Sequence, residues 1–289
     1  MKRALSVAGL TLQLEADREM AVGKAFEPFL TASDAADLQL VLRQVSALPP
    51  IPEAVLHAET GSRVHPDGKG GSFRSFCDPL TDTGTYAVAY NTHRGVQVEY
   101  LEAGGYRFTD LQSAFYHLDL AQLLLSRRRL CIHAACVQTA LGGILFSGPS
   151  GIGKSTQAKL WCEYRGAVQI NGDRPILSRE EDGWRAWGSP YAGSSRCHVN
   201  AGCPVSAIVM LRRADRCHGR RLDAREAFRA VWSGLALPRW DAVAMETALD
   251  LAAALAAEVP VWEFGCTPDA EAVAYLEQLL RKDVGLCVN

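Results

Sequence analysis

The sequence predicts an α/β core with a mixed β-sheet and flanking helices, preceded by a β-rich α+β domain. Three observations lead to this fold class. Before residue 127, apolar and polar residues alternate over short segments, as in half-buried strands. After residue 128, short apolar runs alternate with helical stretches, as in α/β proteins. A glycine-rich motif then separates an expected strand from an expected helix. We therefore expect two domains, residues 1–127 and residues 128–289.

Length and composition exclude several classes of protein. The 289 residues are 48% hydrophobic and 21% charged, which is ordinary for a globular chain with a real core. A net charge of −2 excludes binding of nucleic acid by bulk positive charge. No apolar run reaches 18 residues, so we expect no membrane span. The nine cysteines are odd in number and none form a C-x-x-C pair, which favours reduced thiols and a cytoplasmic location.

The first half contains mostly strand patterns. Pro49-Pro50 would end one helix, and Asn91 to Gly95 would connect a hairpin. The elements expected here are a strand at 4–14, a helix at 32–48, a mobile loop at 61–71, hairpin strands at 85–90 and 96–101, and a helix at 110–126.

The second half alternates strands with helices. Pro260 near the start of the last expected strand suggests that this strand lies on an edge of the sheet. We expect strands at 130–138, 143–147, 167–170, 207–211 and 259–264, and helices at 155–165, 223–233, 240–257 and 270–280.

The strongest signal is the segment from Gly148 to Ser155, which matches G-x-x-x-x-G-K-[ST] in full. An apolar strand precedes it and an amphipathic helix follows it, which is the context that a phosphate-binding loop requires. Glycines let the backbone turn tightly, so that N–H groups converge on phosphate oxygens. The alternative is a chance glycine-rich turn. The residues expected to bind nucleotide are Gly148, Ser150, Gly151, Ile152, Gly153, Lys154, Ser155 and Thr156.

Three side chains of this segment have expected roles toward ATP and Mg²⁺. Lys154 would reach the β- and γ-phosphates, and the Ser155 hydroxyl would ligate Mg²⁺. Thr156 would contact the α-phosphate. The chain has only six lysines, so Lys154 is one of few candidates for a functional lysine.

Asp173 is a candidate second metal ligand or general base. It follows the strand expected at 167–170, and an acidic residue after a neighbouring strand commonly holds Mg²⁺ or activates the attacking group. The alternative is a turn residue, because Asn171-Gly172-Asp173 is a good turn sequence. The chain lacks an N-K-x-D tetrapeptide and a long strand ending in D-E, which makes a GTPase or a motor ATPase less favoured.

The order of these features resembles the HPr kinase/phosphorylase family, which has a phosphoenolpyruvate carboxykinase-like P-loop fold. The resemblance rests on His133 within IHAACV, the loop at 148–155, Arg165-Gly166 and Asp173-Arg174. It covers roughly residues 130–209. The first half does not look like the regulatory domain of the bifunctional enzyme. The chain is more similar to stand-alone members, some of which phosphorylate ribosomally made peptides during maturation.

The resemblance implies roles for individual positions. His133 matches the active-site histidine beside the phosphates, and Asp173 matches the second aspartate of the family's pair. The first aspartate of that pair is Gly172 here. Asp173 would then serve either the metal or the acceptor proton, and the loss argues against a reverse phosphorylase reaction.

A second loop, from Gly188 to Arg196, is rich in glycine and serine and would suit an anionic or hydroxyl-bearing substrate. Arg196 is a candidate to neutralise transition-state charge. His198 is a weaker candidate for general base, since a lone histidine is more often structural. The arginines between 212 and 221 form either a solvated loop or a binding site for a nucleotide or an acidic peptide.

The combined prediction is an ATP- and Mg²⁺-dependent kinase that phosphorylates a hydroxyl on a Ser or Thr of a peptide or protein. The expected catalytic residues are Lys154, Asp173, His133 and Arg196, with Ser155 and Asp173 as metal ligands. A small-molecule kinase and a nucleotide-sensing protein without catalysis are the alternatives. The domain at 1–127 would bind or present the substrate. Neither nucleic acid nor membrane is an expected partner, and a homo-oligomer is expected because the family often assembles.

Overall fold

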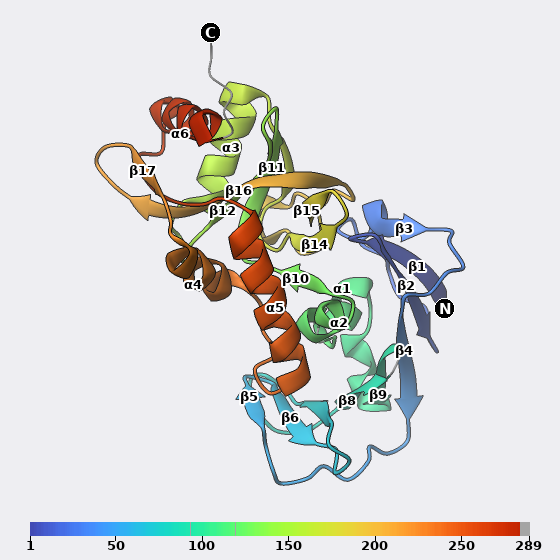
Figure 1. Ribbon diagram of the computed structural model, residues 1–289. Helices are drawn as coiled ribbons and strands as arrows, with labels where there is room; N and C mark the ends of the chain where they lie inside the picture. Colours follow the sequence, from blue (N-terminus) through green and yellow to red (C-terminus); the bar gives the residue numbers. More distant parts are fainter. Residues whose placement is uncertain (93, 119, 284–289) are drawn as a thin grey trace. The chain divides into compact units, whose positions relative to one another are not determined.

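The computed structural model describes residues 1–92, 94–118 and 120–283 (Figure 1), and the chain forms two compact units. The first unit contains residues 1–123 and 238–245. The second contains residues 124–237 and the chain from 246 onward. Residues 238–245 lie within the predicted second domain, yet in the structure they pack with the first unit.

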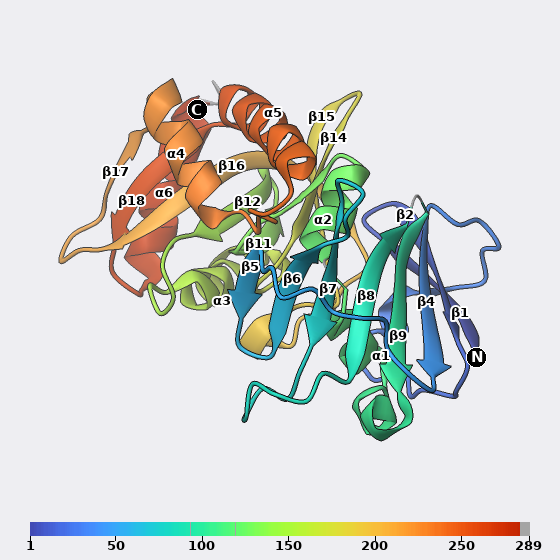
Figure 2. The ribbon, with the colours of Figure 1, turned by 90° about the horizontal axis from the view of Figure 1, so that it is seen from below.

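A nine-stranded sheet forms the first unit, in the order β3-β1-β2-β4-β9-β8-β7-β6-β5, and Figure 2 shows its strands side by side. The pairs β2–β4 and β4–β9 are parallel, and the other neighbours are antiparallel. The strands are β1 (Lys2–Val7), β2 (Leu10–Ala16), β3 (Leu30–Thr31), β4 (Leu38–Val45), β5 (His57–Glu59), β6 (Ser62–Pro66), β7 (Ser72–Phe76), β8 (Ala87–Thr92) and β9 (Gly95–Leu101).

Helical segments of the first unit are short. They are η1 (Glu27–Phe29), η2 (Glu102–Arg107), α1 (Leu111–Tyr116) and the start of α2 (Leu120–Ser126). Asp110 begins α1 with a capping box, in which its carboxylate accepts the Ser113 N–H at 2.7 Å.

Several predictions for the first unit are corrected by the structure. The segment predicted as a helix at 32–48 contains β4, whose buried Leu38, Leu40 and Leu42 alternate with less buried residues, the period of a strand. The strand predicted at 4–14 is a hairpin of β1 and β2 that turns at Ala8 and Gly9, both at positive φ. The helix predicted at 110–126 is two helices, and the predicted loop at 61–71 contains β6. The hairpin of β8 and β9 is confirmed.

The second unit has a mixed sheet in which β12 and β16 are parallel neighbours, as are β16 and β18. The antiparallel strands β11 and β13 continue it on one side, and β17 pairs with β18 on the other. The start of β16 also pairs with β15, which leads to β14 and β10. These strands are β10 (Arg129–Cys131), β11 (Ala134–Thr139), β12 (Gly142–Ser147), β13 (Val168–Asn171), β14 (Ile176–Glu180), β15 (Gly183–Trp187), β16 (Gly202–Arg213), β17 (His218–Arg221) and β18 (Val261–Cys266).

Helices pack on this sheet, with α3 and α6 on one face and α4 on the other (Figure 1). Buried residues of α3 and α6, including Trp161 and Leu276, join Phe146 of β12 and Phe264 of β18 in one apolar cluster. Burying each large side chain stabilises the fold by about 1.5–3 kcal/mol, so the strand and helix that flank the glycine-rich loop are held firmly. The helices and the one 3-10 helix are α3 (Lys154–Arg165), α4 (Ala224–Gly234), α5 (Ala242–Glu258), α6 (Ala270–Asp283) and η3 (Gly193–Ser195).

The second unit also corrects two predictions. The strand predicted at 130–138 is interrupted at Ile132 and His133, because His133 N–H donates to Gly234 O at 2.7 Å and so leaves the ladder. The strand after Pro260 is internal, since β18 lies between β16 and β17. No helix within the described ranges is long and apolar enough to cross a membrane. Their eight cysteines are all free, and Cys287 lies outside the described residues.

Candidate functional site

The segment from Gly148 to Ser155 connects the carboxyl end of β12 to the start of α3. Gly148, Gly151 and Gly153 have φ of 139°, 73° and 114°. A Cβ on Gly151 or Gly153 would meet no atom within 4 Å, so the backbone conformation rather than crowding requires glycine there. The first N–H groups of a helix have no partners inside the helix. The segment therefore ends at the unpaired N–H groups that begin α3.

Lys154 is buried under this loop. Its Nζ donates to Gly148 O at 3.0 Å and to Pro149 O at 3.1 Å, and the residue is 8% exposed. Burial lowers the pKa of Lys154, while the Asp173 carboxylate acts in the opposite direction. The ammonium is thus fixed beside the loop backbone, within electrostatic reach of Asp173.

The remaining loop residues differ in exposure. Ser150 and Thr156 are exposed, and Ile152 and Ser155 are half-buried. Arg213 at the end of β16 donates from Nη2 to Gly151 O at 2.8 Å and so ties the loop to the neighbouring strand.

His133 and Asp173 lie together at the start of β11. His133 Nε2 is 3.2 Å from Asp173 Oδ1, and both side chains are about one-third exposed. Backbone bonds hold the pair in place, since Ala134 N–H donates to Asp173 O at 3.0 Å and Ser147 Oγ donates to His133 O at 3.0 Å. The pair is therefore anchored both to the strand that enters the loop and to the turn after β13.

Burial lowers the pKa of His133, and the positive charges of Lys154 and Arg174 lower it further. Asp173 opposes this shift. The balance of these effects favours the neutral imidazole, in which one ring nitrogen can accept a hydrogen bond or a proton.

Asn171 positions Asp173. Its side chain is fully buried, and its Oδ1 accepts the N–H groups of Asp173 at 2.9 Å and Arg174 at 2.7 Å. Its Nδ2 donates to Ser189 O at 3.1 Å. This amide fixes the turn from which the Asp173 carboxylate projects.

Gly172 stands where the family resemblance leads one to expect the first aspartate of the pair, the one before Asp173. A Cβ at Gly172 would lie 1.9 Å from Ser195 Oγ and 2.4 Å from Ser195 Cβ. Ser195 is held there by its bond to Ala192 O at 2.5 Å. Close packing of η3 therefore explains the glycine, and it leaves no room for a carboxylate.

The loop that contains η3 contacts Asp173 through Gly193, where an added Cβ would lie 2.9 Å from Asp173 Cβ. Arg196 follows η3 with φ of 52°, and its side chain is exposed. His198 pairs with Asn171 through the backbone. The structure thus brings this loop to the site, while the role of Arg196 stays a prediction.

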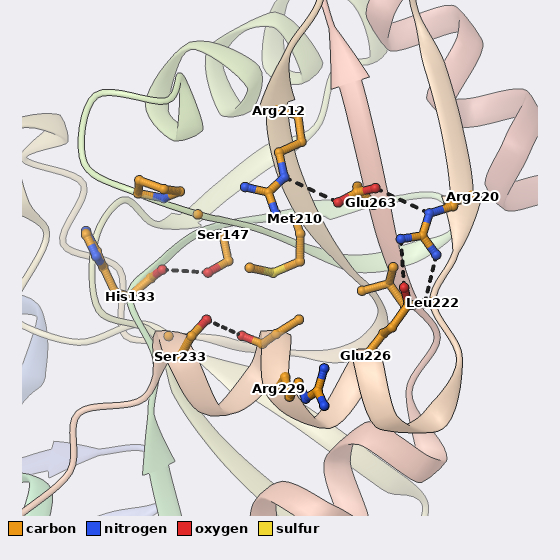
Figure 3. A pocket seen from close by; sticks show the side chains of 14 residues that line it. His133, Ser147, Met210, Arg212, Arg220, Leu222, Glu226, Arg229, Ser233 and Glu263 are labelled. Atoms are coloured by element: carbon orange, nitrogen blue, oxygen red, sulfur yellow. Dashed lines mark hydrogen bonds and ion pairs between the residues drawn. The ribbon is translucent and has the colours of Figure 1, made fainter.

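Two cavities flank the loop. The first, which we call the His133 cavity, has a volume of about 530 Å³ and extends from His133, Gly148 and Pro149 toward α4 (Figure 3). The second, the Thr156 cavity, has a volume of about 390 Å³ and is lined by Gly151, Ile152, Gly153, Thr156, Gln157, Arg213, Ala214, Cys266, Thr267 and Pro268.

Arginines and glutamates line the far part of the His133 cavity. Glu263 accepts from Arg212 and from Arg220, each at 3.3 Å, and Arg220 binds Glu226 through two nitrogens at 2.7 and 2.9 Å. These bonds raise the pKa of Arg220 and lower the pKa of Glu226. The fifth charged residue is Arg229.

The sequence predicted roles for the 148–155 loop, Asp173 and His133, and the structure places Lys154, Asp173 and His133 in one electrostatic cluster. It missed Asn171, which carried only a turn signal, and Arg229, which lies on a helix far along the chain. The arginines of the 212–221 segment lie in different surroundings. Arg212 and Arg220 line the His133 cavity, whereas Arg221 forms an ion pair with Asp283.

Comparisons with known proteins give little beyond this geometry. No family model matches the chain, and no curated protein matches it. The chain has a distant structural similarity to the HPr(Ser) kinase/phosphatase from Coxiella burnetii, with 15% sequence identity and a TM-score of 0.34. That similarity covers 54% of this chain and 98% of the other.

Proposed function

We propose that this protein is an ATP- and Mg²⁺-dependent kinase that transfers the γ-phosphoryl group to a hydroxyl, on a Ser or Thr of a peptide or protein. The observation that carries the proposal is the cluster of Lys154, Asp173 and His133 beside a G-x-x-x-x-G-K-S loop at a strand–helix junction. A buried cation and a carboxylate at a loop of this kind are parts that recur in phosphoryl transfer, and the His133 imidazole adds a second group that can take a proton.

Each side chain has a role in the proposed reaction. Lys154 and the loop N–H groups neutralise the phosphate charge. The acceptor hydroxyl oxygen attacks the γ-phosphorus, the bond between that phosphorus and the β–γ bridging oxygen breaks, and ADP leaves. The hydroxyl proton passes to Asp173 or to His133. Catalysis of this kind depends chiefly on positioning and electrostatics.

The residues present fit a magnesium ion that is shared with phosphates. No group of three or more His, Cys, Asp or Glu within the described part of the chain could hold a metal. Mg²⁺ is usually bound by one or two carboxylates together with waters and substrate phosphates, so Ser155 and Asp173 would suffice. When bound, the ion would supply positive charge at the β- and γ-phosphate oxygens.

The test is ATP turnover by Lys154→Ala, with Lys159→Ala as the matched control. Lys159 lies on the same helix and is exposed, so its removal subtracts the same charge without touching the loop. We expect Lys154→Ala to lose at least about 10²-fold in turnover and to keep the circular-dichroism spectrum of the wild type. We expect the turnover of Lys159→Ala to match the wild type. Wild-type turnover by Lys154→Ala would contradict the proposal.

A second function, nucleotide sensing without phosphoryl transfer, is favoured by the packing at Gly172, which leaves Asp173 as the one carboxylate of the expected pair. Incubation with γ-³²P-ATP and candidate peptides or metabolites separates the two functions. Label on any acceptor supports the kinase. Tight ATP binding with no labelled acceptor supports the sensor.

A further inference from the structure

We propose that the His133 cavity is the acceptor site, and that Arg229 makes it selective for a hydroxyl compound that also carries an anionic group. The proposal rests on the proposed kinase function for the identity of the acceptor, but the anion site itself follows from the lining of the cavity. The two therefore have separate tests.

Of the two cavities, the His133 cavity is the one suited to the acceptor. An acceptor hydroxyl must approach both the γ-phosphate and the group that takes its proton. His133, which contacts Asp173, lines the His133 cavity together with Gly148 and Pro149 of the loop. The Thr156 cavity adjoins the other end of the loop and is not lined by His133; Asp173 lines neither cavity and reaches the His133 cavity only through its contact with His133. The nucleoside would therefore occupy the Thr156 cavity, and the acceptor the His133 cavity.

The charges that line the His133 cavity do not balance. Three arginines and two glutamates line it, so one positive charge remains uncompensated. Glu263 is occupied by Arg212 and Arg220. Glu226 is occupied by Arg220 and also accepts the Asp223 N–H as part of the α4 capping box. Both glutamates are thus already bonded elsewhere.

Arg229 is the cation left over. Its guanidinium forms no hydrogen bond or ion pair within the described part of the chain, and its charge reaches Glu226 only as one of the smaller causes that lower the pKa of that carboxyl. It lies on α4, one turn after Glu226, and Figure 3 shows α4 across the cavity from Arg212. A guanidinium presents paired N–H donors that match a carboxylate or phosphate. The site therefore suits an anion at a distance from His133.

The cavity also has an apolar part of its lining and a limited volume. The apolar residues Met210, Leu222 and Ala230 also line the cavity. A volume of about 530 Å³ holds a small molecule or a few residues of a peptide. The acceptor class is thus a compound with a hydroxyl at the loop end, a short apolar part, and a carboxylate or phosphate at the Arg229 end. A peptide terminus and a free organic acid share this chemistry.

The test measures binding rather than transfer, on the full chain saturated with Mg²⁺ and a non-hydrolysable ATP analogue. The probes are matched pairs that differ in one anionic group: N-acetylserine and its amide, a serine-containing peptide with a free or an amidated carboxyl terminus, and glycerol phosphate and glycerol. We expect at least one acid to bind about tenfold more tightly than its neutral partner. Preference for the peptide pair identifies a peptide terminus, and preference for either small pair identifies a free acid.

Variants assign the effect to Arg229. Arg229→Gln should abolish the preference, Arg229→Lys should retain part of it, and Arg225→Gln should leave it intact, because Arg225 is an exposed arginine on the same helix outside the cavity lining. The proposal is overturned if no acid binds more tightly than its neutral partner, or if Arg229→Gln keeps the preference. The experiment measures binding and not turnover. Its result can therefore be interpreted even if the protein turns out not to be a kinase.

Discussion

His133 Nε2 lies 3.2 Å from Asp173 Oδ1, although the two residues belong to different turns of the chain. The contact forms because β11 pairs with both β12 and β13, so the residue before β11 meets the residues after β13. The His133 imidazole is thereby held against a carboxylate beside the 148–155 loop. In the proposed reaction either member could take the acceptor proton, and the Asp173 charge acts on His133.

The pair predicts non-additive kinetics. Asp173→Asn should lower turnover by about 10²–10⁴-fold, the usual contribution of a positioned acid or base. His133→Gln should lower it less, because the carboxylate remains. The double variant should be close to Asp173→Asn alone, since residues that act as a unit do not add. Steady-state kinetics of the three variants checks this, and additive losses would mean that the residues act independently.

Gly153→Ala should weaken nucleotide binding more than it weakens the fold. At φ of 114° an added Cβ meets no neighbouring atom, so the effect comes from backbone conformation, at about 1–3 kcal/mol. The loop can relax this strain by moving its N–H groups away from the phosphates. Titration with a fluorescent ATP analogue and urea unfolding together measure both effects. Gly166→Ala is the matched control, because Gly166 also has positive φ and open space but ends α3, so only stability should fall.

Asn171→Ala should lower both stability and turnover. The substitution removes the acceptor for two N–H groups, and each buried group left unpaired costs about 1–3 kcal/mol. Asp173 would lose its fixed turn, so turnover should fall toward that of Asp173→Asn. Denaturant unfolding and ATP turnover measure the two effects. Asn200→Ala is the control, because Asn200 is exposed in the same unit, and it should change neither stability nor turnover. Unchanged turnover in Asn171→Ala would show that Asn171 does not position Asp173.

The stability of the first unit should depend on the protonation of His117. Burial lowers the pKa of this side chain to about 4, from 6.5, while Nδ1 donates to Ser113 O and Nε2 accepts from Tyr86. The unfolded chain takes up the proton at higher pH than the folded chain. Stability should therefore fall as the pH decreases from about 6.5 to about 4, by roughly 3 kcal/mol, and then level off for this group.

Urea unfolding of the full chain across this pH range tests the prediction. His117→Gln should have a shallower dependence on pH than the wild type. His218→Gln, which removes an exposed histidine, should retain the wild-type slope. Equal slopes for wild type and His117→Gln would show that His117 does not contribute.

The sequence predicted the alternation of strands and helices around the 148–155 loop because glycine spacing and apolar runs are local signals. It failed at β4, where Leu38, Leu40 and Leu42 fit a strand but the surrounding length suggested a helix. It could not find Arg229 or the role of Asn171, because both depend on which residues meet after folding. The sequence showed that Gly172 departs from the aspartate pair of the family it resembles, but only the position of Ser195 in the structure explains why a glycine stands there.

The packing of Ser195 against Gly172 also restricts the order in which substitutions could accumulate. An aspartate at Gly172 would collide with the Ser195 side chain, whereas a prior change of Ser195 to glycine would leave Ala192 O, at 3.0 Å, as the nearest atom to the new Cβ. The two positions are therefore epistatic. A lineage or a directed-evolution experiment that gains the missing carboxylate would first open the space at Ser195, because in the reverse order the loop around Ser195 must shift to admit the new side chain.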